Sequence, residues 1–197
     1  MIPCYVGGRG KSAHASTKDF KVAVFELLES TGLGYDTRYR YYRRQYPDMS
    51  REDFARMVCN PIEGYDKDWP DYRERRAGSM SKELSLTAFV LERDQAFRDE
   101  ARAAIICYNE AGLGTGINSM QLLAEGKPLI GFFLRDPTQG PLNVQNIFQL
   151  ELLYPSLVTL VPYDDLNEVS QRLTGWLTEL SREGYNPKGG KTHADSD

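Results

Sequence analysis

The chain has little cysteine and little histidine. Its three cysteines are Cys4, Cys59 and Cys107, its two histidines are His14 and His193, and no two cysteines have the Cys-x-x-Cys spacing. Disulfide frameworks and structural zinc sites need pairs or clusters of these side chains. We therefore expect no disulfide framework and no metal site. Cys4 and Cys107 lie in apolar runs, and we interpret them as buried side chains without chemistry.

Long apolar runs and an excess of positive charge are also absent. The longest apolar runs, such as Pro128–Leu134, are far shorter than the ~20 residues of a membrane-spanning helix, and residues 1–8 lack the basic start of a signal peptide. The net charge is −4, with one dense basic run at Arg38–Arg44, so no broad positive field attracts nucleic acid or acidic membranes. We expect a cytoplasmic protein whose partner is a small molecule, with no nucleic acid and no membrane.

The length and composition fit one globular domain. A chain of 197 residues with 41% hydrophobic and 26% charged residues buries roughly 70% of its unfolded surface without disulfides or metals. No internal repeat is visible. We expect residues 1–184 to form a single domain and the polar residues 185–197 to form a disordered tail.

Apolar runs alternate along the chain with segments of helical periodicity. Strands are predicted over residues 2–8, 35–42, 104–108, 129–134 and 157–161. Helices are predicted over residues 19–30, 81–103, 117–125 and 144–153, and a last helix buries Leu166, Val169, Leu173, Trp176, Leu177 and Leu180. Residues 43–80 have no sustained period and predict a long loop with one short helix near residues 51–58.

This alternation is typical of an α/β protein in which helices cover both faces of a parallel sheet. Five strands favour a flavodoxin-like (Rossmann-like) fold with a five-stranded parallel sheet. Ligands of such sheets bind beyond the carboxyl ends of the strands. We therefore expect the loops that follow Val6, Tyr41, Tyr108 and Leu134 to surround the site.

The most informative segment is glycine-rich and lies between a predicted strand and a predicted helix. Gly112, Gly114 and Gly116 would let the backbone approach a ligand, and free N–H groups at a helix start favour an anion or a sugar oxygen. A tight turn that needs glycine dihedrals is the alternative. The Gly-x-Gly-x-x-Gly fingerprint fails, because its last position falls on Ile117 or Ser119. We therefore expect no cofactor, neither flavin nor nicotinamide.

Several short motifs, in their order and spacing, resemble the nucleoside 2-deoxyribosyltransferase family. They are Arg93-Asp94, Gly112-Leu-Gly-Thr-Gly116, Gly126-Lys-Pro128 and Gly140-Pro-Leu-Asn143, and Tyr5-Val-Gly-Gly8 matches the family's opening strand. The resemblance extends over residues 93–143, is weaker in the first strand and hardly covers residues 35–87. It implies the same fold and a pocket for a nucleoside or nucleotide.

The resemblance assigns Asn118 and Asp94 to the catalytic positions. In the family, a glutamate on the first turn of the helix after the glycine loop attacks the anomeric carbon and forms a glycosyl ester. Asn118 matches that position, and since an amide is a poor nucleophile, the expected role is a hydrogen bond to the sugar; a helix-start residue is the alternative. Asp94 matches the carboxylate that contacts the base or assists proton transfer at the leaving group, and a surface charge is its alternative.

The resemblance also assigns ligand-binding residues. Tyr5, Gly7 and Gly8 would line the pocket together with the three glycines of residues 112–116, although a strand aromatic is equally often a core residue. Asn143 matches an asparagine that reaches the pocket of a neighbouring subunit, which implies a homo-oligomer.

Two further features are candidates from the residues alone. Glu92 and Glu110 are expected near strand ends, where either could act as a general base, and solvated charges are the alternative. The run from Tyr35 to Tyr46 interleaves aromatics with arginines. It would stack a base or bind a phosphate, or else form an edge strand with a wet face.

Two functional hypotheses remain. The first is an enzyme acting on N-glycosidic bonds, a transferase or a nucleoside or nucleotide hydrolase, in which Asp94 or another acid acts while Asn118 orients the sugar. The second is a nucleoside- or nucleotide-binding sensor or regulatory module that kept the pocket and lost the nucleophile. Asn118 weighs against ordinary transferase chemistry, whereas the glycines, Asp94 and Asn143 favour an intact pocket.

Overall fold

Five parallel strands form the centre of the fold. The computed structural model describes residues 1–9, 15–50, 52–53, 57, 66–135 and 144–182. The strands are β1 (Ile2–Gly7), β2 (Gly34–Asp36), β3 (Ala103–Cys107), β4 (Leu129–Leu134) and β5 (Val158–Tyr163), and they lie in the order β2-β1-β3-β4-β5. The predicted α/β class is confirmed, and this strand order is the flavodoxin-like one. The tail predicted over residues 185–197 lies outside the described residues.

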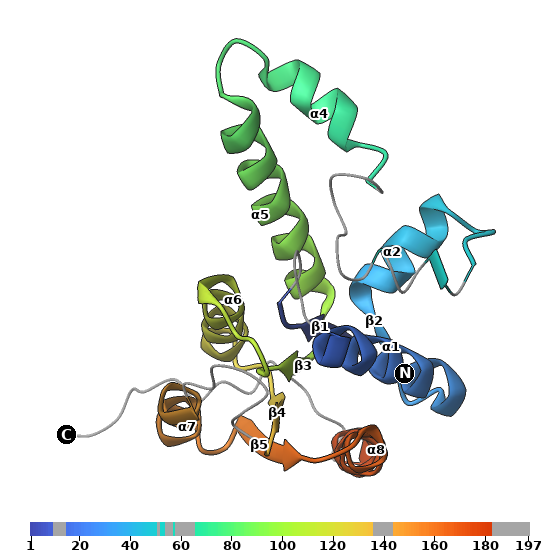
Figure 1. Cartoon of the computed structure of the whole chain (residues 1–197), viewed down its shortest axis with the longest axis vertical. Coiled ribbons are helices and arrows are strands. Elements are labelled where there is room, and N and C mark those ends of the chain that lie inside the picture. Colours follow the sequence, from blue (N-terminus) through green and yellow to red (C-terminus); the bar gives the residue numbers. More distant parts are fainter. Residues whose placement is uncertain (10–14, 51, 54–56, 58–65, 136–143, 183–197) are drawn as a thin grey trace.

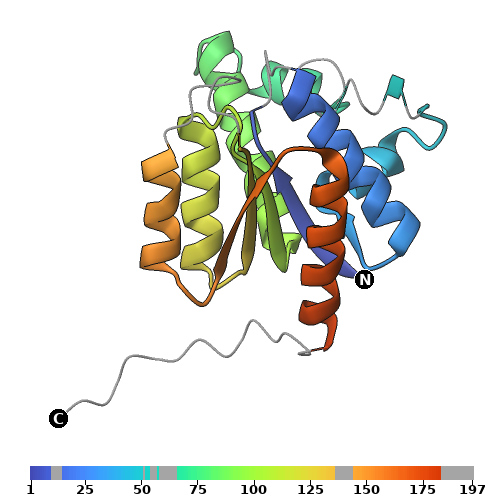
Figure 2. The same cartoon turned by 60° about the horizontal axis from the view of Figure 1, so that its bottom comes forward.

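Helices cover both faces of the sheet (Figures 1 and 2). α1 (Ala15–Thr31) and α8 (Leu166–Arg182) pack on one face. α2 (Thr37–Gln45), the C-terminal part of α5 (Lys82–Glu100), α6 (Leu113–Ala124) and α7 (Val144–Leu153) pack on the other. None of the helices that the structure describes is long and apolar enough to cross a membrane.

The central strands send alternate side chains into two separate cores. Cys4 and Val6 of β1 join the core beneath α1 and α8, whereas Tyr5 joins the core beneath the other helices. β3 alternates in the same way, with Cys107 on the first side and Ile106 on the second. Burial raises the pKa of the Cys107 thiol to about 11, which fits the interpretation of this cysteine as a buried side chain without chemistry.

The second predicted strand is wrong over most of its length. β2 ends at Asp36, and the chain then forms helix α2 instead of continuing as a strand. The side chain of Asp36 accepts a hydrogen bond of 2.8 Å from the backbone N–H of Arg38, which caps the helix. Tyr42 is fully buried and its ring lies 6.1 Å from that of Phe97 on α5. Capping and burial of one helical face therefore override the β-propensity of the tyrosines, and Tyr41 does not end a strand.

Residues 43–80 are not one loop. α4 (Trp69–Arg76) begins with Pro70 in its first turn, where proline costs no hydrogen bond, and forms with α5 a hairpin that projects from the sheet (Figure 1). Trp69 and Tyr72 pack their rings 5.5 Å and 4.9 Å from Phe89 of α5. This small core was not predicted, and the helix expected near residues 51–58 lies largely outside the described residues.

Gly131 on β4 gives a test of the sheet packing. A Cβ at this position would lie 2.4 Å from Tyr108 Cε2 and 2.9 Å from Leu160 Cδ2, and the Tyr108 ring is held by a 2.8 Å hydrogen bond with Ser119. We expect Gly131→Ala to lower the free energy of unfolding by about 1–3 kcal/mol, since it overpacks a buried site. Urea denaturation followed by circular dichroism measures the change.

Gly114→Ala is the matched control for this substitution. No heavy atom lies within 4 Å of a Cβ built at Gly114, and the residue is part of helix α6. Its substitution should leave stability unchanged or raise it by up to about 1 kcal/mol. Equal stability of the two variants would contradict the close approach of the Tyr108 ring to β4.

Candidate functional site

The carboxyl ends of β1, β3 and β4, where three of the four expected loops begin, lie along one edge of the sheet. β1 ends at Gly7, β3 at Cys107 and β4 at Leu134. The fourth expected loop, after Tyr41, is absent from this edge because Tyr41 lies within α2. Parallel sheets bind ligands at this edge. The candidate site is formed by polar side chains on the sheet face that α2, α5 and α6 cover.

Three of the predicted residues come together in this site. Asn118 on α6 donates a hydrogen bond of 2.7 Å through Nδ2 to Tyr5 Oη on β1. The same Nδ2 lies 3.4 Å from Asp94 Oδ2 on α5, within hydrogen-bonding range. The three side chains are distant in sequence and come from three different elements. The structure therefore forms a polar cluster from the residues that the family resemblance singled out, and we refer to Tyr5, Asp94 and Asn118 as the Asn118 cluster.

Arg98 belongs to the same site and was missed by the sequence interpretation. Its guanidinium donates to Asn118 Oδ1 through Nη1 and, at 2.8 Å, to Gln95 Oε1 through Nη2. The residue is only 2% exposed, and Lys127 Nζ donates to its backbone carbonyl. Arg98 follows Asp94 by four residues on α5, a spacing that places both on one face of the helix. That spacing is the feature of the sequence that could have indicated Arg98 as a neighbour of Asp94.

Arg38 is a second arginine beside the cluster, and it belongs to the run from Tyr35 to Tyr46 that the sequence offered for stacking a base or binding a phosphate. Its guanidinium carbon lies 5.7 Å from the centre of the Tyr5 ring, and Nη2 donates to the backbone carbonyl of Val6. Asp36 lies 3.9 Å from Arg38 Nε. Burial raises the pKa of Asp36, and the neighbouring Arg38 partly opposes that increase. α2 thus supplies a positive charge to the β1 side of the site.

Tyr5 is a neutral phenol at physiological pH. Burial raises the pKa of its hydroxyl, and Asp94 raises it further, whereas Arg38 and Arg98 lower it. Both arginines and the carboxylate therefore act on the same hydroxyl. Tyr5 is 3% exposed and belongs to the core on this face, which bears out its alternative as a core residue, and its role in a ligand pocket stays a prediction.

The glycine segment differs from its prediction. α6 begins at Leu113, not at residue 117, with Gly112 as its N-cap and with Gly114 and Gly116 inside the helix. None of these glycines has a positive φ, which rules out the tight-turn alternative. Asn118 therefore lies in the second turn and is not a helix-start residue. The helix start has no side-chain cap, and a Cβ at any of the three glycines would meet no heavy atom within 4 Å. Among the described residues, the N-cap therefore supplies no side-chain acceptor to the first N–H groups of α6.

Gly7 and Gly8 are required by the packing at the end of β1. A Cβ at Gly7 would lie 2.6 Å from Ile106 Cδ1, and Gly8 has a φ of +139°, which L side chains rarely adopt. Lys21 of α1 is 1% exposed, and its Nζ donates to the carbonyl oxygen of Arg9 at 2.8 Å and to that of Gly8 at 3.4 Å. A buried lysine therefore holds the start of the β1–α1 loop.

Glu110 holds the same loop from the end of β3. Its Oε2 accepts a hydrogen bond of 2.7 Å from Thr17 Oγ1, and its Oε1 lies 3.9 Å from Arg9. Glu110 is 4% exposed, so it is not the solvated charge that was the alternative. Thr17 and Arg9 both belong to the α1 side of the sheet, and the structure does not bring Glu110 into the Asn118 cluster.

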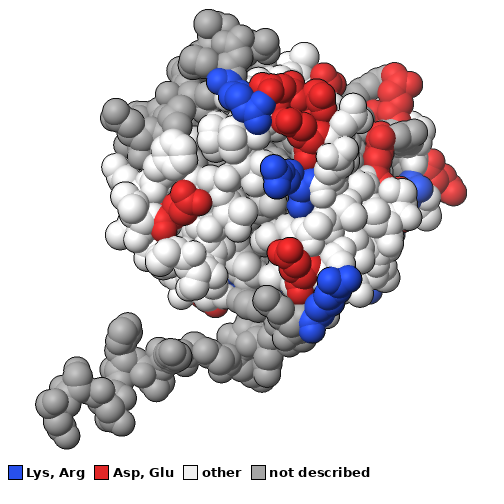
Figure 3. All heavy atoms as spheres, turned by 90° about the horizontal axis from the view of Figure 1, so that it is seen from below, with Lys and Arg blue, Asp and Glu red and all other residues white. Residues whose placement is uncertain are grey.

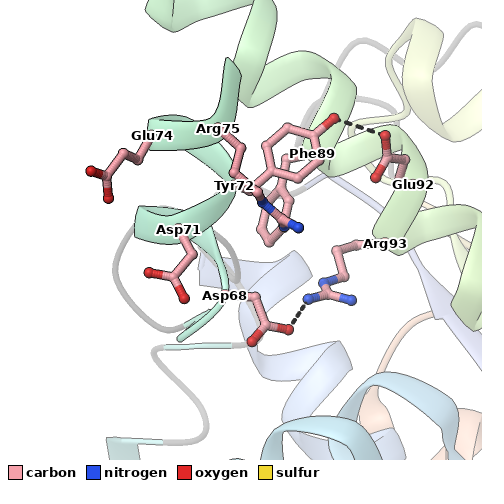
Figure 4. Close-up of a pocket in the computed structure, with 8 residues that line it drawn as sticks. All are labelled: Asp68, Asp71, Tyr72, Glu74, Arg75, Phe89, Glu92 and Arg93. Atoms are coloured by element: carbon pink, nitrogen blue, oxygen red, sulfur yellow. Dashed lines mark hydrogen bonds and ion pairs between the residues drawn. The ribbon is translucent and has the colours of Figure 1, made fainter. Parts of the chain in front are cut away.

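Glu92 is separated from the cluster in a different way. It lines a hollow of about 790 Å³ between α4 and α5, together with charged and aromatic side chains (Figure 4). Its carboxylate accepts a hydrogen bond of 2.7 Å from Tyr72 and lies 3.8 Å from Arg76. In the same hollow, Arg93 of the predicted Arg93-Asp94 pair forms ion pairs with Asp66 and Asp68. Both side chains therefore support the hairpin.

The remaining predicted features have separate outcomes. The aromatic and basic run from Tyr35 is mainly helix α2, so the edge-strand alternative is wrong, and Tyr41 packs its ring 5.4 Å from Phe97. Asn143 lies outside the described residues. Among the residues that are described, no three His, Cys, Asp or Glu side chains gather in a way that could hold a metal ion.

Comparison with known proteins adds no family assignment. No family model matches the chain, and no curated protein matches it. The fold and the site define an α/β protein with a parallel sheet and a polar cluster on the sheet face that α5 and α6 cover.

Proposed function

We propose that this protein binds a nucleoside or a nucleotide at the Asn118 cluster, as a relative of the deoxyribosyltransferase type. The observation that supports this most is the convergence of Tyr5, Asp94 and Asn118, three residues that the family resemblance assigns to one pocket from sequence motifs alone. The cluster offers an amide, a phenol and a carboxylate. Groups of this kind form hydrogen bonds with sugar hydroxyls and with the edge of a base.

A nucleoside or nucleotide should therefore raise the melting temperature of the protein. A ligand that binds only the folded state stabilises it by RT ln(1 + [L]/Kd), about 2.7 kcal/mol at a concentration of 100 Kd. Differential scanning fluorimetry with a panel of nucleosides and nucleoside monophosphates at millimolar concentration measures the shift. The proposal fails if the panel has no effect while a nicotinamide or a flavin stabilises the protein.

Cleavage or transfer of the N-glycosidic bond is the second candidate function. Asp94 favours it, because this carboxylate is partly exposed and lies 3.4 Å from Asn118, and the family resemblance assigns it to contact with the leaving base. Release of free base from deoxynucleosides and nucleoside monophosphates, followed by chromatography, tests this candidate. In that case Asp94→Asn should abolish base release, whereas ligand binding without base release supports the sensor or regulatory module.

We also propose that the protein is a homo-oligomer that uses the outer surface of α6 and α7. The two helices lie side by side on one face of the sheet (Figure 2) and contain a single charged residue, Glu151. In Figure 3 the side of the molecule where α7 lies is mainly uncharged. Interface cores are apolar and poor in charge. The exposed apolar side chains on these helices are Leu113, Ile117, Met120, Phe148, Leu152 and Leu153.

Light scattering should accordingly show a dimer or a larger assembly of the 22.4 kDa chain. Leu152, which is 82% exposed, is the best residue to disturb the surface, and Leu152→Glu should shift the assembly toward monomer because it buries a carboxylate in an apolar interface. Leu84→Glu, at a leucine that is 61% exposed on α5, is the control and should leave the assembly intact. A native monomer at all working concentrations contradicts the expectation.

A further inference from the structure

Arg98 is a buried cation with uncharged side-chain partners. It is 2% exposed, and its two hydrogen-bonded side chains, Asn118 and Gln95, are neutral amides. Its Nε has no hydrogen-bond partner in the part of the chain that the structure describes. Among the described residues, no carboxylate forms an ion pair with this guanidinium. Buried charges are normally paired, so the site carries a positive charge that the protein itself does not neutralise by contact.

The charge of Arg98 acts directly on Asn118. A guanidinium only donates hydrogen bonds, so Asn118 must present Oδ1 to Arg98 and Nδ2 to Tyr5 and Asp94. Arg98 thereby fixes the amide with its donor group toward the rest of the cluster. It acts through Asn118 and is a positioning residue.

Arg98 contributes a positive charge to the cluster. Among the described residues, Asp94 is the one carboxylate that reaches Asn118, and it is partly exposed, so water screens its charge. Arg98 is buried and is screened much less. Arg38, which is 9% exposed, is a second buried guanidinium beside Tyr5, and Asp36, 3.9 Å from its Nε, offsets its charge. The start of α6, whose N-cap Gly112 has no side-chain acceptor, adds partial positive charge from its first N–H groups.

We infer that Arg98 makes the Asn118 cluster selective for a ligand whose sugar carries an anionic phosphate ester, such as a nucleoside monophosphate, over the uncharged nucleoside. The inference rests on the proposed function and narrows its ligand class. The same charge disfavours cleavage of the N-glycosidic bond, because the transition state places positive charge on the sugar ring. The native site is therefore suited to binding an anion and poorly suited to forming a glycosyl cation.

Isothermal titration calorimetry on the native protein tests the ligand class. A nucleoside monophosphate should bind at least about tenfold more tightly than its nucleoside, and added salt should reduce this preference. Ribose 5-phosphate and inorganic phosphate are the comparison ligands. If ribose 5-phosphate and inorganic phosphate both bind more weakly than the nucleoside monophosphate, the base contributes to binding. If either binds as tightly as the monophosphate, the assignment to a nucleotide is overturned.

Variants at Arg98 separate its charge from its structural role. Arg98→Gln keeps a donor for Asn118 and removes the charge, and it should reduce the preference for the monophosphate about tenfold while nucleoside binding persists. Arg98→Lys keeps the charge and should restore the preference. Arg102→Gln, at an exposed arginine just after α5, is the control. If Arg98→Gln does not fold, the salt dependence of the native preference and the preference of the Arg98→Lys variant test the role of the charge.

Two outcomes distinguish failure of this inference from failure of the proposed function. If the native protein binds nucleoside and monophosphate equally, the selectivity assigned to Arg98 is wrong and the pocket stands. If the native protein binds neither, the proposed function itself is wrong.

Discussion

Asn118→Glu should create base release where the native protein has little. The substitution supplies the carboxylate that the deoxyribosyltransferase family uses as nucleophile, and the surrounding side chains suit a carboxylate. Arg98 already donates a hydrogen bond to the side chain at position 118, and the Tyr5 hydroxyl lies 2.7 Å from it.

The new carboxylate would also give Arg98 an anionic partner. An ion pair between the introduced carboxylate and the Arg98 guanidinium neutralises the buried charge that we infer to oppose a glycosyl cation. Asn118→Glu therefore has two effects that act together. It supplies a nucleophile, and it neutralises the charge of Arg98 that would repel a glycosyl cation. We expect base release from deoxynucleosides and nucleoside monophosphates to rise on the order of 100-fold or more above the native rate. Chromatography of the released base measures this.

Asn118→Gln is the control for the effect of size. It lengthens the side chain as Glu does and adds no charge, so it should not release base. A native protein that already turns over rapidly, and that Asn118→Glu leaves unchanged or damages, would show that Asn118 does not occupy the nucleophile's place. Asp94, the one other acid of the cluster, would then be the residue to substitute.

The sheet could be predicted because most of its strands are uninterrupted apolar runs. β3 is buried along its whole length and β4 nearly so, and such runs are typical of parallel strands covered on both faces. The strand predicted over residues 35–42 was wrong, because the tyrosines there favour strands by propensity and yet belong mainly to a helix. The side chain of Asp36 caps this helix. Hydrophobic periodicity and residue propensity do not predict such a cap.

The candidate site could be predicted only where the order and spacing of short motifs indicate its residues. The resemblance located Tyr5, Asp94 and Asn118 without any statement of distance, and the structure places them in hydrogen-bond contact. Arg38 and Arg98 could not be found in that way. An arginine is usually exposed, so the sequence gives no sign that these two are buried, and their effect on the site depends on that burial.

Lys21→Met should be among the most destabilising single substitutions in the protein. Lys21 is 1% exposed, and its ammonium donates to the carbonyl oxygens of Gly8 and Arg9, where the chain leaves β1. Methionine fills nearly the same volume and cannot donate, so two carbonyls lose a charged donor in a buried site. We expect the free energy of unfolding to fall by about 2–4 kcal/mol, measured by urea denaturation.

The same substitution should weaken ligand binding, since Gly7 and Gly8 belong to the predicted pocket and their loop would lose its support from α1. Lys18→Met is the matched control: it removes an exposed lysine from the same helix and should change stability by no more than about 0.5 kcal/mol. Tyr5 precedes Gly7 by two residues. Ligand binding at the Asn118 cluster, measured on the folded fraction of the Lys21→Met variant, therefore shows whether the loop has changed. If Lys21→Met and Lys18→Met prove equally stable, the buried ammonium does not hold the loop, and the β1–α1 connection must be fixed by Glu110 and Thr17.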